Sequence, residues 1–159
     1  MIIEESVLIS APLKKVWDTF TDLTCWRDWC TVLDDISAST DRITKGKSFK
    51  FCIRPFDIPI HLEPVVEEVI PEKRIVWTGT KLGVSARHKF TFEKKDGKTL
   101  LRSRETFSGF MISSMSFIFP KKKLQELSTM ILQEIKEASE NHRAPHPGSG
   151  KIWEKKSSK

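Results

Sequence analysis

Alternating apolar and polar positions dominate residues 84–107 and predict a β-hairpin. Asp96-Gly97 lies between the two alternating runs and is typical of a two-residue hairpin turn. The positions that share the inner face are Val84, Ala86, His88, Phe90 and Phe92 before the turn, and Leu101, Ser103, Glu105 and Phe107 after it. This face carries one histidine and one carboxylate among aromatic side chains, a pattern that indicates a pocket.

The apolar face also fixes the register of this hairpin. Directly paired residues of antiparallel strands share a face, so keeping Phe92 beside Leu101 places His88 opposite Glu105. A three-residue loop would pair His88 with Arg104 instead and would turn Arg102 and Arg104 toward the phenylalanines. We therefore reject that second register.

The remaining patterns predict an α+β protein. A strand over residues 2–9 precedes two short helices, one with Leu13, Val16, Trp17 and Phe20 at helical spacing and one through Trp26 to Trp29. Further strands are expected over residues 36–38, 48–54, 58–69 and 74–80. Residues 121–140 form an amphipathic helix whose apolar stripe is Leu124, Leu127, Ile131, Ile135 and Ala138. A curved antiparallel sheet of about seven strands wrapped around this long helix would bury the stripe and one face of each strand.

Charge and composition divide the chain into a domain over residues 1–140 and a basic tail over 141–159. The chain has 27 Lys and Arg and 21 Asp and Glu, but the tail holds five of the basic residues and one acid. The first 140 residues are therefore nearly neutral, and we expect no nucleic-acid partner. Pro, Gly and Ser between Arg143 and Gly150 predict a mobile tail, in which Trp153 is either loose or docked on an apolar surface.

The sequence disfavours several kinds of functional site and of cellular location. The N-terminus lacks the features of a signal peptide, and the most apolar run, residues 107–119, is too short to span a bilayer, so we expect a cytoplasmic protein. Cys25, Cys30 and Cys52 form no C-x-x-C pair and indicate neither a disulfide framework nor a metal site. We find no phosphate-binding glycine loop or nucleophile elbow, and we expect no cofactor.

Several segments together resemble the START-like (SRPBCC) superfamily over residues 2 to about 140. They are Ser10–Asp18 (SAPLKKVWD), Asp22-Leu23 through Trp29, Val69–Trp77 (VIPEKRIVW), His88-Lys-Phe90 with Gly97-Lys-Thr99, and Glu105–Gly109 (ETFSG). The resemblance implies a helix-grip fold with a hydrophobic cavity between sheet and C-terminal helix, gated by loops and by residues 110–119. Members include lipid-transport proteins, polyketide cyclase/dehydrase-like proteins and co-chaperones, so the fold implies no reaction.

A cavity of this kind would be lined by inward-facing side chains, most of them apolar. The expected ligand-binding residues are Phe49, Phe51, Ile53, Ile58, Ile60, Leu62, Trp77, His88, Phe90, Phe92, Leu101, Ser103, Glu105, Leu127 and Ile131. The alternative is that these side chains fill a solid core. The favoured function is binding of a small, largely apolar ligand that is lipid-, polyketide- or aromatic-like.

His88 and Glu105 are the weak catalytic candidates. They could transfer protons in an enzyme of the polyketide cyclase/dehydrase type, contact the polar end of a ligand, or satisfy each other structurally. A co-chaperone-like interaction module is a third class of function. Lys121-Lys122-Lys123 at the start of a helix opposes the helix dipole, which is explained either by a solvated charge run or by transient contact with an anionic membrane surface.

Overall fold

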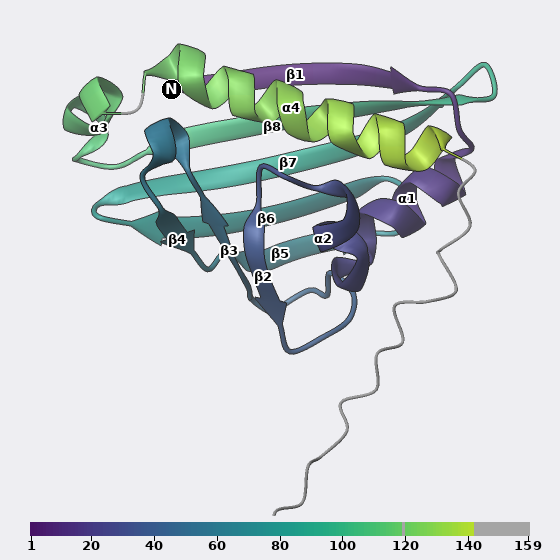
Figure 1. Ribbon diagram of the computed structural model, residues 1–159, viewed down its shortest axis with the longest axis horizontal. Helices are drawn as coiled ribbons and strands as arrows, with labels where there is room; N and C mark the ends of the chain where they lie inside the picture. The colour runs from purple at the N-terminus through teal and green to yellow at the C-terminus, as the bar shows by residue number, and fades with distance from the viewer. Residues whose placement is uncertain (119, 142–159) are drawn as a thin grey trace, which may run out of the picture.

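The computed structural model describes residues 1–118 and 120–141, and it is an α+β fold with a long C-terminal helix (Figure 1). The predicted tail, with Trp153, lies outside these residues. The large antiparallel sheet has the order β1-β8-β7-β6-β5. Its strands are β1 (Ile2–Ile9), β5 (Val65–Ile70), β6 (Arg74–Lys81), β7 (Val84–Lys95) and β8 (Lys98–Ser108).

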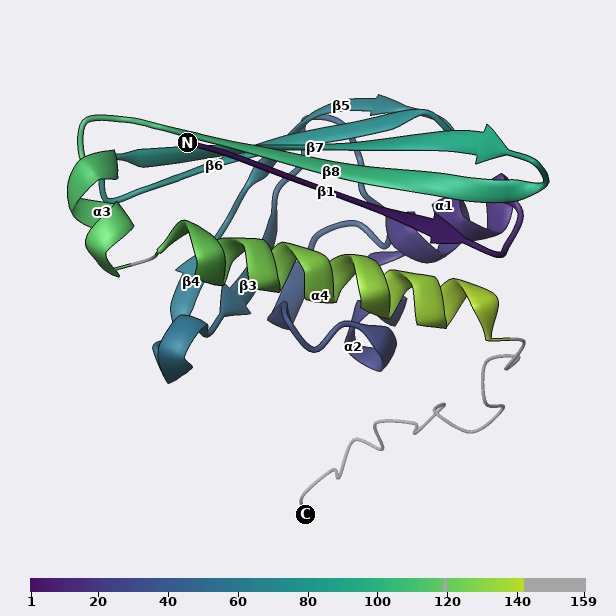
Figure 2. The same cartoon turned by 90° about the horizontal axis from the view of Figure 1, so that it is seen from above.

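A smaller sheet and the helices complete the domain. The small sheet has the order β2-β3-β4, with β2 (Asp34–Ala38), β3 (Phe49–Ile53) and β4 (Ile60–Leu62). The helical elements are α1 (Leu13–Thr21), η1 (Leu23–Cys25), α2 (Trp26–Trp29), η2 (Pro55–Asp57), α3 (Ile112–Ile118) and α4 (Lys121–Glu140). Figure 2 shows α4 running along the inner side of the large sheet, so the predicted helix-grip fold is confirmed.

The central hairpin has the predicted register. His88 pairs with Glu105 and Phe92 pairs with Leu101 across β7 and β8. Asp96 and Gly97 both have positive φ, 50° and 76°, as a two-residue turn of this twist requires. The alternation of the sequence therefore places the histidine and the carboxylate side by side on the inner face.

The strand expected over residues 58–69 is wrong as a single element. The chain leaves the small sheet after Leu62 and enters the large sheet at Val65, so β4 and β5 belong to different sheets. Pro64 lies at the break, and proline cannot donate a ladder hydrogen bond. This break raises the strand number from about seven to eight within the described residues.

Part of the core lies where α1 packs between the large sheet and α4. Trp17 lies edge-on to Phe92, with ring centroids 5.0 Å apart, and Phe20 meets the same ring at 5.5 Å. On α4, Ile131, Leu132 and Ile135 are buried, whereas Leu124 and Leu127 are only half-buried. The C-terminal end of the apolar stripe on α4 therefore faces a filled core, and its N-terminal end faces a less densely packed region.

Candidate functional site

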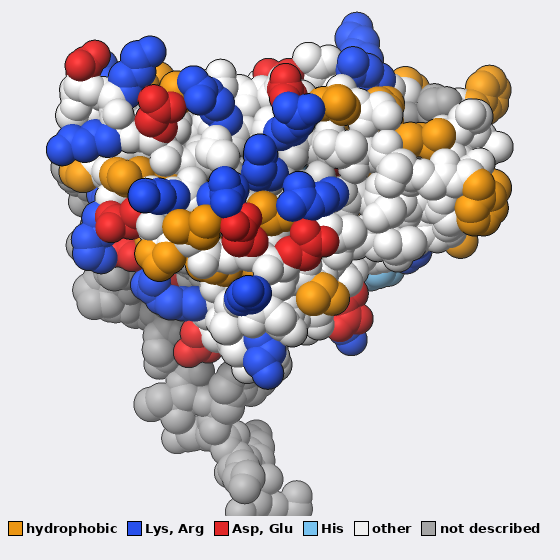
Figure 3. All heavy atoms as spheres, turned by 180° about the vertical axis from the view of Figure 1, so that it is seen from behind, with side chains coloured by type: hydrophobic (Ala, Val, Ile, Leu, Met, Phe, Trp, Pro, Cys, Tyr) orange, Lys and Arg blue, Asp and Glu red, His pale blue; other side chains and the backbone are white. Residues whose placement is uncertain are grey.

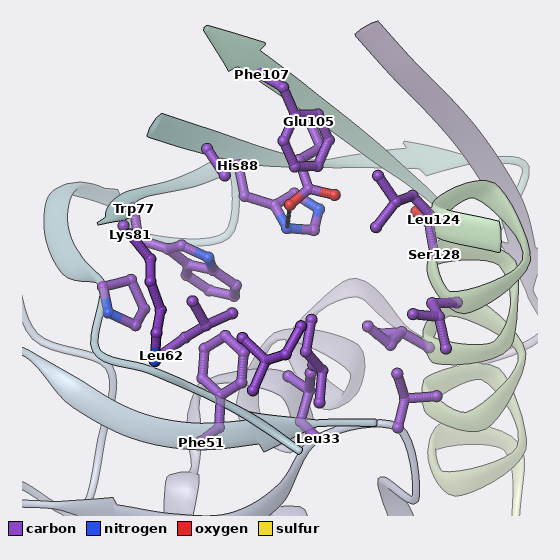
Figure 4. A pocket seen from close by; sticks show the side chains of 18 of the residues that line it. Leu33, Phe51, Leu62, Trp77, Lys81, His88, Glu105, Phe107, Leu124 and Ser128 are labelled. Atoms are coloured by element: carbon purple, nitrogen blue, oxygen red, sulfur yellow. Dashed lines mark ion pairs between the residues drawn. The ribbon is translucent and has the colours of Figure 1, made fainter. Parts of the chain in front are cut away.

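A cavity of about 460 Å³ lies between the large sheet, the small sheet and the N-terminal half of α4 (Figure 4). Its walls are largely apolar, and among the described residues that line it four have polar side chains: Lys81, His88, Glu105 and Ser128. The expected residues found on its walls are Phe51, Ile53, Ile58, Ile60, Leu62, Trp77, His88, Phe90, Glu105, Leu127 and Ile131. This volume falls in the usual range for small-molecule pockets.

Four expected lining residues lie off the walls. Phe92 and Leu101 are buried in the end of the interior that α1 fills, and Phe49 is packed against the rings of Trp26 and Trp77. Ser103 is buried behind His88 and contacts its ring rather than the cavity. All four point inward as the alternation predicts, but neighbouring side chains cover them.

Many residues that line the cavity were not among those expected from the sequence. Val32 and Leu33 come from the segment after α2, a stretch with no regular period, and Phe20 and Trp26 come from helices read only as core. Small residues Gly79 and Ala86 leave space at the sheet. The other missed residues are Met1, Pro59, Pro64, Lys81, Leu82, Val84, Phe107, Ile112, Leu124 and Ser128. Several of these continue the same strand alternation or helix stripe, which is the signal that could have found them.

Polar groups meet at one corner of this apolar cavity. His88 Nδ1 lies 3.9 Å from Glu105 Oε1, and His88 Nε2 lies 2.6 Å from Ser103 Oγ. Ser103 Oγ is 3.3 Å from the Oγ of Ser128 on α4. The imidazole also stacks on Phe90, with ring centroids 4.0 Å apart. Ser103, itself bonded to Ser128, and the phenyl ring hold the imidazole, and its Nδ1 side faces Glu105.

Burial determines the protonation states of the two ionisable side chains at this corner. The side chains of His88 and Glu105 are 10% and 21% exposed, and Figure 4 shows the carboxyl directed into the cavity. Desolvation lowers the pKa of His88 to about 3 and raises the pKa of Glu105 to about 7. Near neutral pH the imidazole is therefore uncharged, and the carboxyl exchanges its proton in the physiological range.

The mouth of the cavity has an apolar rim beside lysines. Phe110 and Phe117 are 86% and 92% exposed, and the other exposed apolar side chains at this end are Phe56, Ile58, Leu82 and Met111. Figure 3 shows apolar side chains at the end of the molecule that carries α3. Lys121 and Lys122 are exposed at the start of α4, and Lys123 Nζ lies 5.5 Å from the centre of the Phe56 ring.

The outer face of the large sheet differs from this rim. Basic and acidic side chains are interspersed over it (Figure 3). Several form ion pairs, including Arg87 with Glu67 at 3.1 Å and Arg104 with Glu4 at 2.9 Å. The visible face is therefore a mosaic of charge rather than a uniform basic surface.

Among the described residues, one group outside the cavity has the chemistry of metal ligands. Ligand atoms of Asp35, Cys52 and His61 lie within 4.8 Å of one another on the small sheet. Arg54 already pairs there with Asp35, at 3.5 Å. Burial raises the pKa of the Cys52 thiol, which disfavours the thiolate that a metal needs. We assign no metal to this group.

Family comparison agrees with this architecture. Residues 1–135 match the model of the family described as polyketide cyclase/dehydrase and lipid transport. The chain belongs to this family. The START-like resemblance of the sequence is thereby confirmed. No functionally curated protein shows significant sequence similarity to this family member.

Solved structures share the fold at low identity. The protein TTHA0849 from Thermus thermophilus is 12% identical with a TM-score of 0.74, covering 87% of this chain and 97% of its own. A START superfamily protein from Mycobacterium smegmatis is 10% identical with a TM-score of 0.63, covering 87% and 94%. The di-domain ARO/CYC BexL from the BE-7585A biosynthetic pathway is 17% identical with a TM-score of 0.71, covering 90% of this chain and 51% of BexL. These likenesses establish the fold alone.

In the described part of the chain, no helix has both the length and the apolar character to cross a bilayer.

Proposed function

We propose that this family member binds one small, largely apolar molecule in the cavity between the large sheet and α4. The observation that carries the proposal is the cavity itself, whose volume of about 460 Å³ is enclosed mainly by aliphatic and aromatic side chains. An apolar molecule would remove this surface from water, at roughly 25 cal/mol per Å² buried. A lipid-, polyketide- or aromatic-like ligand fits these walls.

Filling the cavity tests this proposal. Ala86 lines the cavity from β7, so Ala86→Phe should occupy ligand space and weaken naphthalene binding by at least about tenfold, measured by quenching of tryptophan fluorescence. Ala38→Phe is the matched control, because Ala38 is exposed on β2. Equal naphthalene affinity in both variants would overturn the proposal. Native mass spectrometry of the purified protein would identify a retained ligand.

We propose that the rim around the mouth contacts an anionic membrane surface while ligand is exchanged. Exposed aromatic side chains such as Phe110 and Phe117 suit insertion at the interface, and the adjacent lysines match negatively charged headgroups. Each lysine near such a surface contributes about 1 kcal/mol. Two of the rim residues, Ile58 and Leu82, also line the cavity, which joins the contact surface to the ligand path.

Vesicle binding tests whether the rim contacts an anionic membrane surface. We expect co-sedimentation with phosphatidylserine-containing vesicles but little with pure phosphatidylcholine vesicles. The double variant Phe110→Ser/Phe117→Ser should lose most of this binding. Leu8→Ser removes an exposed leucine of β1 and is the control. Retained binding in the double variant would contradict membrane contact through the rim.

Proton-transfer catalysis of the polyketide cyclase/dehydrase type is the second candidate. It is favoured by the Glu105 carboxyl, whose pKa of about 7 is suited to a general acid or base near neutral pH. In that case Glu105→Gln and His88→Ala should each lower turnover of an enolisable polyketide-like ketone by about 10²–10⁴-fold. Naphthalene affinity should remain nearly unchanged. Turnover that persists in both variants would exclude these two residues as the proton-transfer pair.

A further inference from the structure

Among the described residues, the Glu105 carboxyl has no hydrogen-bond partner, although it lies at an apolar cavity wall. Within the described chain, the one interaction found for it is with His88 Nδ1 at 3.9 Å, which is longer than a hydrogen bond. The carboxyl points into the cavity beside Leu124 and Ser128 (Figure 4). A carboxyl left unpaired in such a place is costly, so a ligand group that bonds to it gains affinity.

Neighbouring polar groups present neutral atoms to the same corner. Ser103 Oγ is hydrogen-bonded to His88 Nε2, so Nδ1 is the ring nitrogen on the Glu105 side. Ser128 Oγ reaches the cavity from α4 while it bonds to Ser103. A ligand at this corner therefore meets a carboxyl, an imidazole nitrogen and a hydroxyl.

The cationic groups that line the cavity are engaged elsewhere. The Met1 ammonium donates to the Phe107 carbonyl at 3.1 Å, and Lys81 Nζ donates to the His61 carbonyl. Burial keeps His88 uncharged near neutral pH. Among the described residues of the cavity wall, the other charged or titratable groups are thus His88, Lys81 and the N-terminus, and none of them has a hydrogen bond to the Glu105 carboxyl.

A hydroxyl on the ligand matches this corner in either protonation state of Glu105. It donates to the carboxylate when the proton is absent, and it accepts from the carboxyl when the proton is present. A ligand carboxylate can only accept and would bring a second negative charge into an apolar site. Two carboxyl groups held close together cannot both be ionised without a large penalty.

We propose that the cavity selects ligands whose polar end is an uncharged hydroxyl group, and that Glu105 is the residue that discriminates against carboxylates. This inference rests on the proposed ligand-binding function. It names Glu105 as a specificity-determining residue, and it assigns His88, Ser103 and Ser128 the role of positioning the polar corner.

The discrimination against carboxylates should increase as pH rises. Burial raises the pKa of Glu105 to about 7, so at pH 6 the carboxyl holds a proton that it can donate to a ligand carboxylate. Above pH 7 that proton must be taken up from solution when an anion binds. Anion affinity should then fall by up to about tenfold for each further pH unit, whereas the affinity of a neutral hydroxyl compound should change little.

The experiment compares naphthalene, 2-naphthol and 2-naphthoate, which share one apolar body, at pH 6 and pH 8. For the natural sequence we expect 2-naphthoate to bind about tenfold more weakly at pH 8 than at pH 6. We expect 2-naphthol and naphthalene to change by less than about threefold. In Glu105→Gln, 2-naphthoate should lose this pH dependence because the amide is neutral and can donate at both pH values. Glu93→Gln, on an exposed position of β7, is the matched control.

The outcomes separate the two proposals. Failure of naphthalene to bind at either pH would overturn the ligand-binding function itself. Naphthalene binding together with equal 2-naphthoate affinities at pH 6 and pH 8 would overturn the inference alone, and this comparison needs only the natural sequence. A pH dependence that persists in Glu105→Gln, with naphthalene affinity intact, would show that another group discriminates.

Discussion

The interior between the large sheet and α4 has two ends that share the same strands and the same helix but differ in packing. At the α1 end, Trp17 and Phe20 meet Phe92, and the space is filled. At the α3 end, Ala86 and Leu124 line a hollow. The inner faces of β7 and β8 alternate in the same way throughout, so the difference comes from what lies opposite them. A strand pattern shows which side chains point inward, and the opposing element determines whether they form core or wall.

The largest expected difference between the two ends comes from truncating one phenylalanine at each end. Phe92→Ala should lower the free energy of unfolding by about 3–5 kcal/mol, because the phenyl ring is buried among aromatic neighbours and leaves a void. Phe107→Ala should cost about 1 kcal/mol, because its half-buried ring already borders empty space. Urea denaturation measures both. Equal losses would show that the two ends are packed alike.

The second test uses the carboxyl at the hollow end. The raised pKa of Glu105 means that the unfolded chain releases its proton near pH 4.5 while the folded chain retains it to about pH 7. The stability linked to this group is therefore complete below about pH 4.5 and is lost as pH rises through 7. Glu105→Gln should unfold with a free energy higher by about 1–3 kcal/mol at pH 8, and with no gain at pH 4.

His88 acts in the opposite direction, because its lowered pKa removes stability as pH falls from 6.5 toward about 3. This contribution is present in both the natural protein and Glu105→Gln, so it cancels when the two are compared at the same pH. Glu93→Gln serves as the exposed control. A Glu105→Gln variant whose stability tracks the natural protein from pH 4 to pH 8 would show that the carboxyl is solvated rather than buried.

A third comparison adds volume instead of removing it. Val16 is fully buried on α1, so Val16→Phe should destabilise the packed end by about 1–3 kcal/mol through overpacking. Ala86→Phe has space available and should change the free energy of unfolding by less than about 0.5 kcal/mol. Thermal melting of both variants measures the contrast. A large destabilisation by Ala86→Phe would indicate that the hollow closes in solution.

The smallest effect compares two buried serines of α4. Ser128 Oγ bonds to Ser103 at the polar corner, so Ser128→Ala should cost about 0.5–1.5 kcal/mol. Ser139 Oγ is buried at the α1 end, and no described residue bonds to it, so Ser139→Ala should be neutral or slightly stabilising. Denaturation of the single variants and the double variant checks this order. The reverse order would show that Ser139 is the better satisfied of the two.

Local sequence determined the central hairpin and the long helix. The register that joins His88 to Glu105 followed from strand alternation and one Asp-Gly turn, and α4 has its predicted bounds of 121–140. Both depend on residues close in sequence, because period and turn chemistry are local properties. The wider resemblance to START-like proteins also came from short segments of the chain.

Tertiary structure decided which inward-facing residues border the cavity. Phe90 and Phe92 occupy equivalent positions on one strand, yet Phe90 is on the wall and Phe92 is covered by α1. Ser103 was expected at the wall but supports His88 from behind, and the partner that continues this chain of hydroxyls, Ser128, comes from α4. Filled core and open cavity require the same apolar side chains, so periodicity cannot distinguish them. Only the packing of elements distant in sequence determines which side chains leave space between them.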